Sequence, residues 1–203
     1  MGIKIHPEAK ALIFDLDGTL SNSLPVHVET WRMLGDKYGF DFDPHIIHEL
    51  TGRPTIEFAQ HIVKRYKINE APETLVSIKQ QSFWELAHLL EPVAEVIAIL
   101  KEYHRKLPLA VGTGASRKSA EIQLKALELK AYFDVIVSAD DVTKHKPHPE
   151  TFLKCARSMK VDPRHCQVLE DGDLGIEAAR TAGMLVTDVR SHINYGEWAA
   201  SKK

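Results

Sequence analysis

Apolar and polar positions along this chain follow two patterns, one typical of strands and one typical of helices. Short, mostly apolar runs with the length and composition of buried strands occur at 11–14, 107–112, 135–138, 166–170 and 184–188. Stretches with helical periodicity lie between them, at 94–103, 117–127, 150–158 and 175–182. Strands that alternate with helices usually pair in parallel, with helices on both faces of the sheet. We therefore predict an α/β fold with a doubly wound, Rossmann-like parallel sheet.

Residues 23–89 break this alternation. They contain no convincing strand, and apolar residues recur at helical spacing in three stretches: 26–34, 56–63 and 75–86. A helical module placed after the first strand explains this pattern. We predict a core domain formed by residues 1–22 and 90–203 and a helical cap formed by residues 23–89.

Composition and charge exclude several classes of protein. The 203 residues are 44% hydrophobic and 27% charged, which is ordinary for a globular protein with a sizeable core. The formal net charge of -2 gives no electrostatic reason to expect nucleic acid or an anionic membrane as a partner. The sequence shows neither a signal peptide nor a run of roughly 18 apolar residues, and Cys155 and Cys166 match no metal or redox spacing. We expect a cytoplasmic protein, either a monomer or a homodimer.

Candidate functional residues follow four of the predicted strands. In chain order they are Asp15 and Asp17, Thr113 and Gly114, Lys146, and Glu170 with Asp171. Ligands of open parallel sheets bind beyond the carboxyl ends of the strands. We therefore expect these residues to meet at one edge of the sheet.

The two aspartates at the first strand end are one residue apart. On a continuous strand, side chains at i and i+2 point to the same side, so Asp15 and Asp17 would repel each other and require a cation. Together with Asp171 they offer hard oxygen ligands, which suit Mg²⁺ better than zinc. Lys146 adds a positive charge, and Thr113 and Gly114 start a turn into a helix, where a hydroxyl, backbone N–H groups and the helix dipole favour an anion. These residues predict a magnesium-dependent phosphate site that contains a nucleophile.

Four motifs resemble those of the haloacid dehalogenase superfamily, in the same order: DLDGTL at 15–20, Thr113 after an apolar strand, the lysine of KPHP and the acidic pair of EDGDLG. The resemblance covers nearly the whole chain and implies a role for each matched residue. Asp15 would attack phosphorus to give an aspartyl-phosphate, and Asp17 would be the acid and base, which requires a pKa raised toward neutrality. Thr113, Gly114 and Lys146 would hold the phosphoryl oxygens.

The same resemblance implies how a metal is bound. Mg²⁺ would be held by Asp15, by the backbone carbonyl of Asp17 and by Asp171, with Glu170 close by. It would reduce the repulsion between an anionic nucleophile and a phosphate dianion. An aspartate at position 17 also resembles the phosphate-transferring members of the superfamily rather than the dehalogenases.

Three functions are compatible with the resemblance. The segment AVGTGASRKSAEIQL is most similar to a bacterial subgroup that hydrolyses fructose 1-phosphate and 6-phosphogluconate, so we expect a small phosphorylated sugar or sugar acid as substrate. A β-phosphoglucomutase is the alternative, because the chain also resembles that group, including His27 and Lys79. A non-catalytic protein that binds phosphometabolites or serves as a scaffold on the same fold is the third reading.

One departure favours hydrolysis over the mutase reaction. The mutase carries an arginine where this chain has Thr55, whereas Arg53 here directly follows Gly52. A mutase must hold a second phosphate group, and a displaced arginine is poorly placed for that task. His27, Arg53 and Lys79 are our candidates for contacts between the cap and the substrate.

Overall fold

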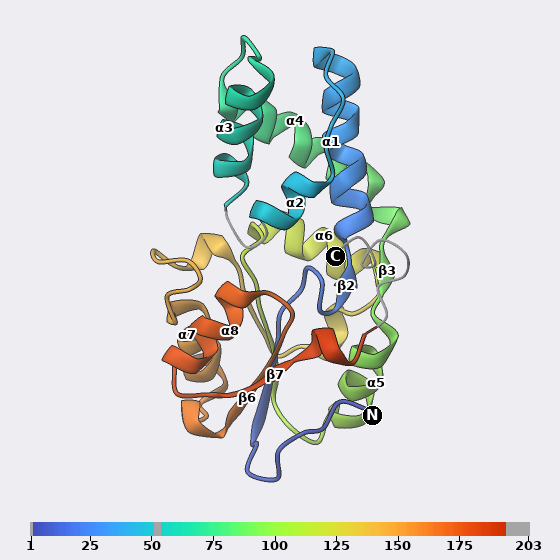
Figure 1. Ribbon diagram of the computed structural model, residues 1–203. Coiled ribbons are helices and arrows are strands. Elements are labelled where there is room, and N and C mark those ends of the chain that lie inside the picture. The colour runs from blue at the N-terminus through green and yellow to red at the C-terminus, as the bar shows by residue number, and fades with distance from the viewer. Residues whose placement is uncertain (1, 51–53, 194–203) are drawn as a thin grey trace.

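The computed structural model describes residues 2–50 and 54–193, which form a helix-flanked sheet and a separate group of helices (Figure 1). The sheet has the strand order β5-β4-β1-β6-β7. Its strands are β1 (Ala11–Phe14), β4 (Leu109–Gly112), β5 (Val135–Val137), β6 (Cys166–Glu170) and β7 (Leu185–Asp188). Every pair of neighbours is parallel, and β1 lies at the centre. The predicted doubly wound α/β fold is therefore confirmed.

Helices cover both faces of the sheet because both faces are apolar. Along β1, Leu12 and Phe14 point to one face and Ala11 and Ile13 to the other, and all four are fully buried. The covering helices are α5 (Ala94–Tyr103) and α6 (Arg117–Ala126) on the first face, and α7 (Glu150–Met159) and α8 (Asp173–Thr181) on the second. Short 3-10 helices in the connections are η2 (Lys130–Tyr132), η3 (Ala139–Asp141), η4 (Pro163–His165) and η5 (Val189–Ser191).

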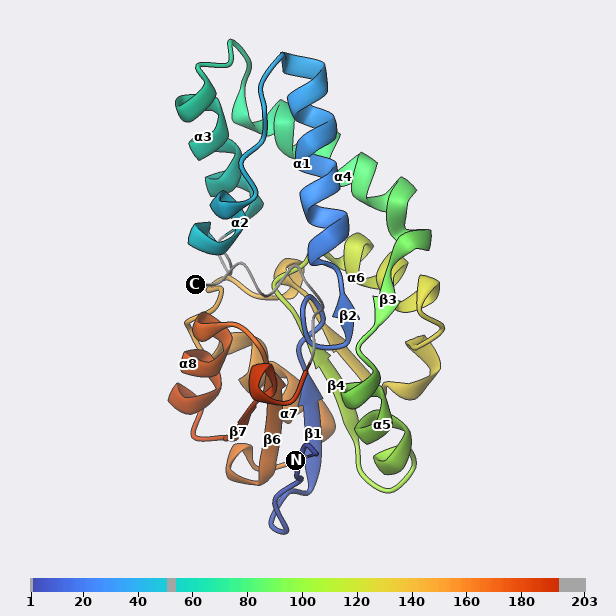
Figure 2. The ribbon, with the colours of Figure 1, turned by 45° about the vertical axis from the view of Figure 1, so that its right-hand side comes forward.

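A second group of helices lies beyond the carboxyl ends of the strands and contacts α6 of the sheet-flanking helices (Figures 1 and 2). This helical insert consists of α1 (Leu24–Tyr38), α2 (His45–Leu50), α3 (Thr55–Tyr66), α4 (Pro72–Glu85) and η1 (Leu86–Leu89). The chain enters it after β2 (Ser21–Asn22) and leaves it before β3 (Glu91–Pro92), and these two strands pair antiparallel. The division into a core and a cap at residues 22/23 and 89/90 stays a prediction.

The helical insert has an apolar cluster of its own. The Trp31 ring stacks on Phe58 and on Phe42, with centroids 5.6 Å and 6.1 Å away, and all three side chains are buried. Helix α2 was not among the three predicted helical stretches, because six residues are fewer than two turns and show too little periodicity. Helix α8 also begins two residues earlier than the predicted helix, at Asp173.

Cys155 and Cys166 are free and buried, and burial raises the pKa of the Cys155 thiol, which keeps it protonated and unreactive. Within residues 2–50 and 54–193, no helix has both the length and the apolar composition needed to cross a bilayer.

Candidate active site

Three candidate residues lie at adjacent strand ends. Strand β1 pairs with β4 on one side and with β6 on the other, and all three end at the same edge of the sheet. Asp15 directly follows β1, Thr113 directly follows β4, and Glu170 is the last residue of β6. Residues from distant parts of the sequence thus meet at the edge that faces the helical insert (Figure 2).

Three carboxylates form an acidic cluster: Asp15, Glu170 and Asp171. One oxygen from each lies within 4.8 Å of the others, and Asp15 and Glu170 are buried. Lys146 reaches into the acidic cluster, with its Nζ 2.6 Å from Asp15 Oδ1 and 2.7 Å from Glu170 Oε2. One lysine leaves an excess of negative charge, and the oxygens are close enough to share one small, hard cation. The acidic cluster therefore fits Mg²⁺.

Burial and mutual repulsion raise the pKa of two carboxyl groups in the acidic cluster. The pKa of Asp15 is well above its ordinary value because of burial and the charge of Glu170, although Lys146 opposes the shift. Burial and Glu170 also raise the pKa of Asp171 to about 7. Burial by itself would lower the pKa of Lys146, but its two carboxylate partners outweigh burial and raise it. A further positive charge would relieve this repulsion.

Two glycines make room for the acidic cluster. A β-carbon on Gly175 would lie 1.8 Å from Glu170 Oε2, and a β-carbon on Gly18 would lie 2.2 Å from Asp171 Oδ2. Thr19 orients the second of these carboxylates, because its Oγ1 donates to Asp171 Oδ1 at 2.8 Å. The glycine of DLDGTL thus leaves room for Asp171 of the distant EDGDLG motif, and the threonine donates a hydrogen bond to it. Sequence analysis did not predict this contact.

The carboxylate of Asp17 lies apart from the acidic cluster, which corrects two expectations. Strand β1 ends before Asp15, so strand alternation does not place the two aspartates side by side. Instead, Asp17 Oδ1 accepts hydrogen bonds from Ser23 Oγ at 2.6 Å, Gln123 Nε2 at 3.1 Å and His27 Nε2 at 3.2 Å. Burial by itself would raise the pKa of Asp17, but His27 and the other donors outweigh burial and lower it to about 2. The prediction of a pKa raised toward neutrality is therefore wrong for this arrangement.

His27 and Lys79 extend the hydrogen-bond network into the helical insert. The Nζ of Lys79 lies 2.6 Å from Nδ1 of His27, whose ring stacks on Phe83 with centroids 4.5 Å apart. Burial and the charge of Lys79 lower the pKa of His27, and burial lowers the pKa of Lys79 to about 8. At neutral pH an ammonium therefore donates to a neutral imidazole, whose Nε2–H is left to donate to Asp17. Contact of either residue with the substrate stays a prediction.

The second motif forms the loop between β4 and α6. Thr113 is buried, and its Oγ1 accepts a hydrogen bond from the backbone N–H of Ala115 at 3.0 Å. Gly114 beside it is exposed. Helix α6 begins at Arg117, where the predicted helical stretch begins, and Ser116 is its N-cap, so Gly114 belongs to the loop that leads into the helix.

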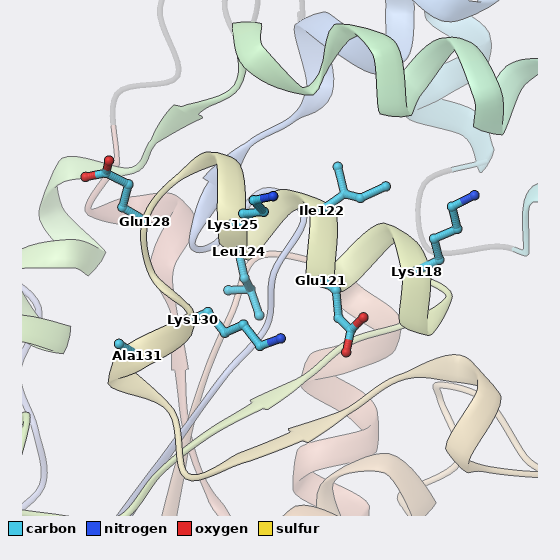
Figure 3. Close-up of a pocket in the computed structure, with 8 residues that line it drawn as sticks. All are labelled: Lys118, Glu121, Ile122, Leu124, Lys125, Glu128, Lys130 and Ala131. Carbon is cyan, nitrogen blue, oxygen red and sulfur yellow. The ribbon is translucent and has the colours of Figure 1, made fainter.

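A surface pocket of about 510 Å³ lies along α6, and no residue of the acidic cluster lines it (Figure 3). Its lining residues are Lys118, Glu121, Ile122, Leu124, Lys125, Glu128, Lys130 and Ala131. None of them is a predicted site residue, and both signs of charge are present around the pocket. Among the predicted site residues, Arg53 lies outside the described part of the chain.

Known proteins resemble this chain in sequence and in structure. The fructose-1-phosphate phosphatase YqaB of Escherichia coli (strain K12) is 42% identical over 180 residues, which cover 88% of this chain and 95% of that protein. A phosphorylated carbohydrates phosphatase of Thermotoga maritima is 30% identical over 179 residues, which cover 86% and 82%. The structure of CbbY from Rhodobacter sphaeroides in complex with phosphate is similar with a TM-score of 0.78 and 25% identity, over 88% of this chain and 84% of that chain.

A family model also matches most of the chain. The model for haloacid dehalogenase-like hydrolases matches residues 12–189, which include all of the sheet except the first residue of β1 and all of the helices of the insert. All four motifs and the acidic cluster fall within that range. The chain therefore belongs to the haloacid dehalogenase-like hydrolase family.

Proposed function

We propose that this protein is a Mg²⁺-dependent phosphatase that hydrolyses small phosphorylated sugars through an aspartyl-phosphate. One observation supports this proposal most strongly: Asp15 and Asp17 are close in sequence but lie in different environments. Asp15 belongs to the acidic cluster, whereas Asp17 is held by donors from Ser23, His27 and Gln123. Different environments allow one carboxylate to be the nucleophile and the other to be the acid and base.

The first step transfers the phosphoryl group to Asp15. A carboxylate oxygen of Asp15 attacks phosphorus, the bond from phosphorus to the ester oxygen breaks, and Asp17 gives a proton to that oxygen, so the sugar leaves as an alcohol. Asp17 is ionised in the free protein at neutral pH, since its pKa is about 2. A phosphate dianion beside it raises the pKa of Asp17, because like charges disfavour ionisation, and Asp17 takes up its proton together with the substrate.

The second step hydrolyses the aspartyl-phosphate. Asp17 accepts a proton from a water molecule, and the oxygen of that water attacks phosphorus. The bond between phosphorus and the Asp15 oxygen breaks, which releases inorganic phosphate and restores the Asp15 carboxylate. The same Asp17 carboxyl group thus gives a proton in the first step and accepts one in the second.

Other residues at the strand ends bind the metal and the phosphate. Asp15, Asp171 and the backbone carbonyl of Asp17 would hold Mg²⁺. When bound, the ion neutralises charge that would otherwise keep the phosphate dianion away from the nucleophile. Thr113 and Lys146 would bind phosphoryl oxygens, and the ammonium of Lys146 already lies 2.6 Å from Asp15.

We further propose that the helical insert covers the site as a cap and that the substrate is a sugar phosphate. His27 on α1 and Lys79 on α4 bring polar groups of the insert next to Asp17. The names of two relatives, a fructose-1-phosphate phosphatase and a phosphorylated carbohydrates phosphatase, support a substrate of this class.

Phosphate release from a panel of sugar phosphates, with MgCl₂ or with EDTA, tests the proposed function. We expect metal-dependent release from fructose 1-phosphate or 6-phosphogluconate, and none from Asp15→Asn protein that keeps its wild-type circular dichroism. A parallel assay follows conversion of β-glucose 1-phosphate to glucose 6-phosphate in the presence of a bisphosphate primer. Conversion without phosphate release would replace the hydrolase with a mutase, and silence in both assays would contradict an enzymatic function.

A further inference from the structure

A third donor to Asp17 comes from Gln123, which belongs to none of the four motifs. Gln123 lies on α6 and is 1% exposed, on the helix face where Ala120 and Leu124 pack against the sheet. Its Nε2 donates to Asp17 Oδ1 at 3.1 Å, although the two residues are 106 positions apart in sequence. A helix of the core thus contacts the proposed acid and base directly.

Stability of the fold does not explain an amide at position 123. The Oε1 atom of Gln123 is buried and has no hydrogen-bond partner among the described residues. An unsatisfied buried oxygen destabilises a protein, whereas a methionine of similar length would fill the same space without a polar atom. The role of this amide must therefore lie in the one contact that it makes.

Gln167 on β6 shows what a buried structural glutamine does in the same protein. It is 3% exposed, its Oε1 accepts from the backbone N–H of His6 at 2.7 Å, and its Nε2 donates to the carbonyl of Lys4 at 3.0 Å and to Thr187 Oγ1 at 2.8 Å. Both ends of the Gln167 amide tie the amino-terminal segment to the sheet. The Gln123 amide forms a hydrogen bond only through its Nε2, to Asp17.

The three donors to Asp17 all bind the same oxygen, Oδ1. Its Oδ2 accepts no hydrogen bond from the described residues, and the side chain is 30% exposed. Ser23 is the N-cap of α1 and His27 lies on α1, so these two donors belong to the helical insert. Among the three donors, Gln123 is therefore the one that lies on a helix packed against the sheet.

We propose that Gln123 is a positioning residue that holds Oδ1 of Asp17 from the core and thereby directs Oδ2 toward the ester oxygen and, later, toward the attacking water. This inference rests on the proposed phosphatase function. Gln123 acts through Asp17 and does not touch the substrate. Its loss should therefore lower kcat and leave KM nearly unchanged, because misalignment slows proton transfer without weakening the binding of phosphate.

Gln123→Met, with Gln167→Met as the matched control, separates positioning from stability. For a sugar phosphate we expect Gln123→Met to lower kcat about tenfold, to change KM by less than about twofold, and to keep or raise Tm. We expect Gln167→Met to lower Tm and keep kcat, because its lost hydrogen bonds are remote from the site. Wild-type kcat in Gln123→Met, or a lower kcat accompanied by a lower Tm, would overturn the inference.

A substrate whose leaving group needs no proton distinguishes misalignment of Asp17 from general damage to the site. The phenolate of p-nitrophenyl phosphate leaves without a proton, so the first step no longer needs Asp17, whereas the second step still needs it as a base. We expect Gln123→Met to release a burst of nitrophenolate at the wild-type rate and then turn over slowly. A burst slowed as much as the steady state would overturn the inference.

A crystal structure of Gln123→Met keeps this test separate from the test of the phosphatase itself. If wild-type protein hydrolyses neither ester, the phosphatase proposal fails, and the position of the Asp17 carboxylate still reports on Gln123. We expect the carboxylate to occupy more than one rotamer in the variant. A single Asp17 conformer identical to that of the wild type would overturn the positioning role.

Discussion

Gly175→Ala is expected to damage the acidic cluster by a purely steric route. Gly175 is buried in α8, and a β-carbon there would lie 1.8 Å from Oε2, 2.2 Å from Cδ and 2.7 Å from Cγ of Glu170. The Glu170 carboxylate would have to move by more than an ångström to reach an ordinary contact distance. That movement would separate its Oε2 from Lys146 Nζ, now 2.7 Å away, and its Oε1 from the backbone N–H of Gly172, now 2.9 Å away.

The size of the effect follows from these contacts. Overpacking a buried position costs about 1–3 kcal/mol, and each lost hydrogen bond to a charged group costs about 1.5–3 kcal/mol. Alanine in a helix interior offsets this with a gain of about 1 kcal/mol over glycine. Since some contacts of Glu170 can form again after it moves, we expect a net loss of about 2–3 kcal/mol in the free energy of unfolding. For a protein of this length, that corresponds to a Tm lower by roughly 5–10 °C.

Thermal unfolding in EDTA, in a double-mutant cycle with Glu170→Ala, tests this steric explanation. In the Glu170→Ala background the clash is absent, so Gly175→Ala should raise the free energy of unfolding by about 1 kcal/mol instead of lowering it. The sign of the effect should thus reverse between the two backgrounds. Equal destabilisation in both backgrounds, or a Gly175→Ala protein as stable as the wild type, would refute the reasoning.

Other predictions concern the metal and the hydrogen-bond network. Thr19→Val should weaken Mg²⁺ binding about tenfold, because Asp171 loses the hydroxyl that orients it. Tm measured against Mg²⁺ concentration reports this affinity, and the same dependence in variant and wild type would contradict the role of Thr19. Burial and Glu170 raise the pKa of Asp171 to about 7, so this metal ligand becomes protonated as the pH falls from about 8 to 6. Calorimetry should therefore show that Mg²⁺ affinity falls over this range and that Mg²⁺ binding releases a proton. An Mg²⁺ affinity that does not change with pH would disprove this coupling. Lys79→Met should raise the pKa of His27, because a nearby positive charge is removed, and an NMR titration with no shift would exclude this coupling. Asp17→Asn should lose turnover and keep Mg²⁺ affinity, since its proposed metal ligand is a backbone carbonyl; loss of metal binding would show that its carboxylate is a ligand.

The sheet and the acidic cluster could be predicted from the sequence because local patterns determine them. Strand β1 is uniformly apolar and ends directly before Asp15, and the parallel topology then brings Thr113 and Glu170 to the same edge. The charge of Lys146 was also expected at this edge. It lies between two of the carboxylates, where it partly neutralises the acidic cluster.

The contacts of Asp17 could not be predicted, because they depend on tertiary structure. Gln123 is 106 positions away, and nothing in the helical pattern of α6 indicates that one of its buried residues reaches a carboxylate. Ser23 and His27 follow Asp17 closely, but their distances depend on how α1 begins after β2. The prediction of a raised pKa counted burial and nearby carboxylates and omitted these three donors, which reverse the direction of the shift.

Transfer of the phosphoryl group to Asp15 is the step on which the proposed reaction depends, and rapid quenching tests it most directly. Wild-type protein and Mg²⁺ would be mixed with a sugar phosphate that carries a radiolabelled phosphoryl group, then quenched in acid and digested. We expect a covalent label on the peptide that contains Asp15, released by hydroxylamine as an acyl phosphate should be, and no label or turnover with Asp15→Asn. Label on a different residue, or turnover that persists in Asp15→Asn, would contradict the assignment of Asp15 as the nucleophile.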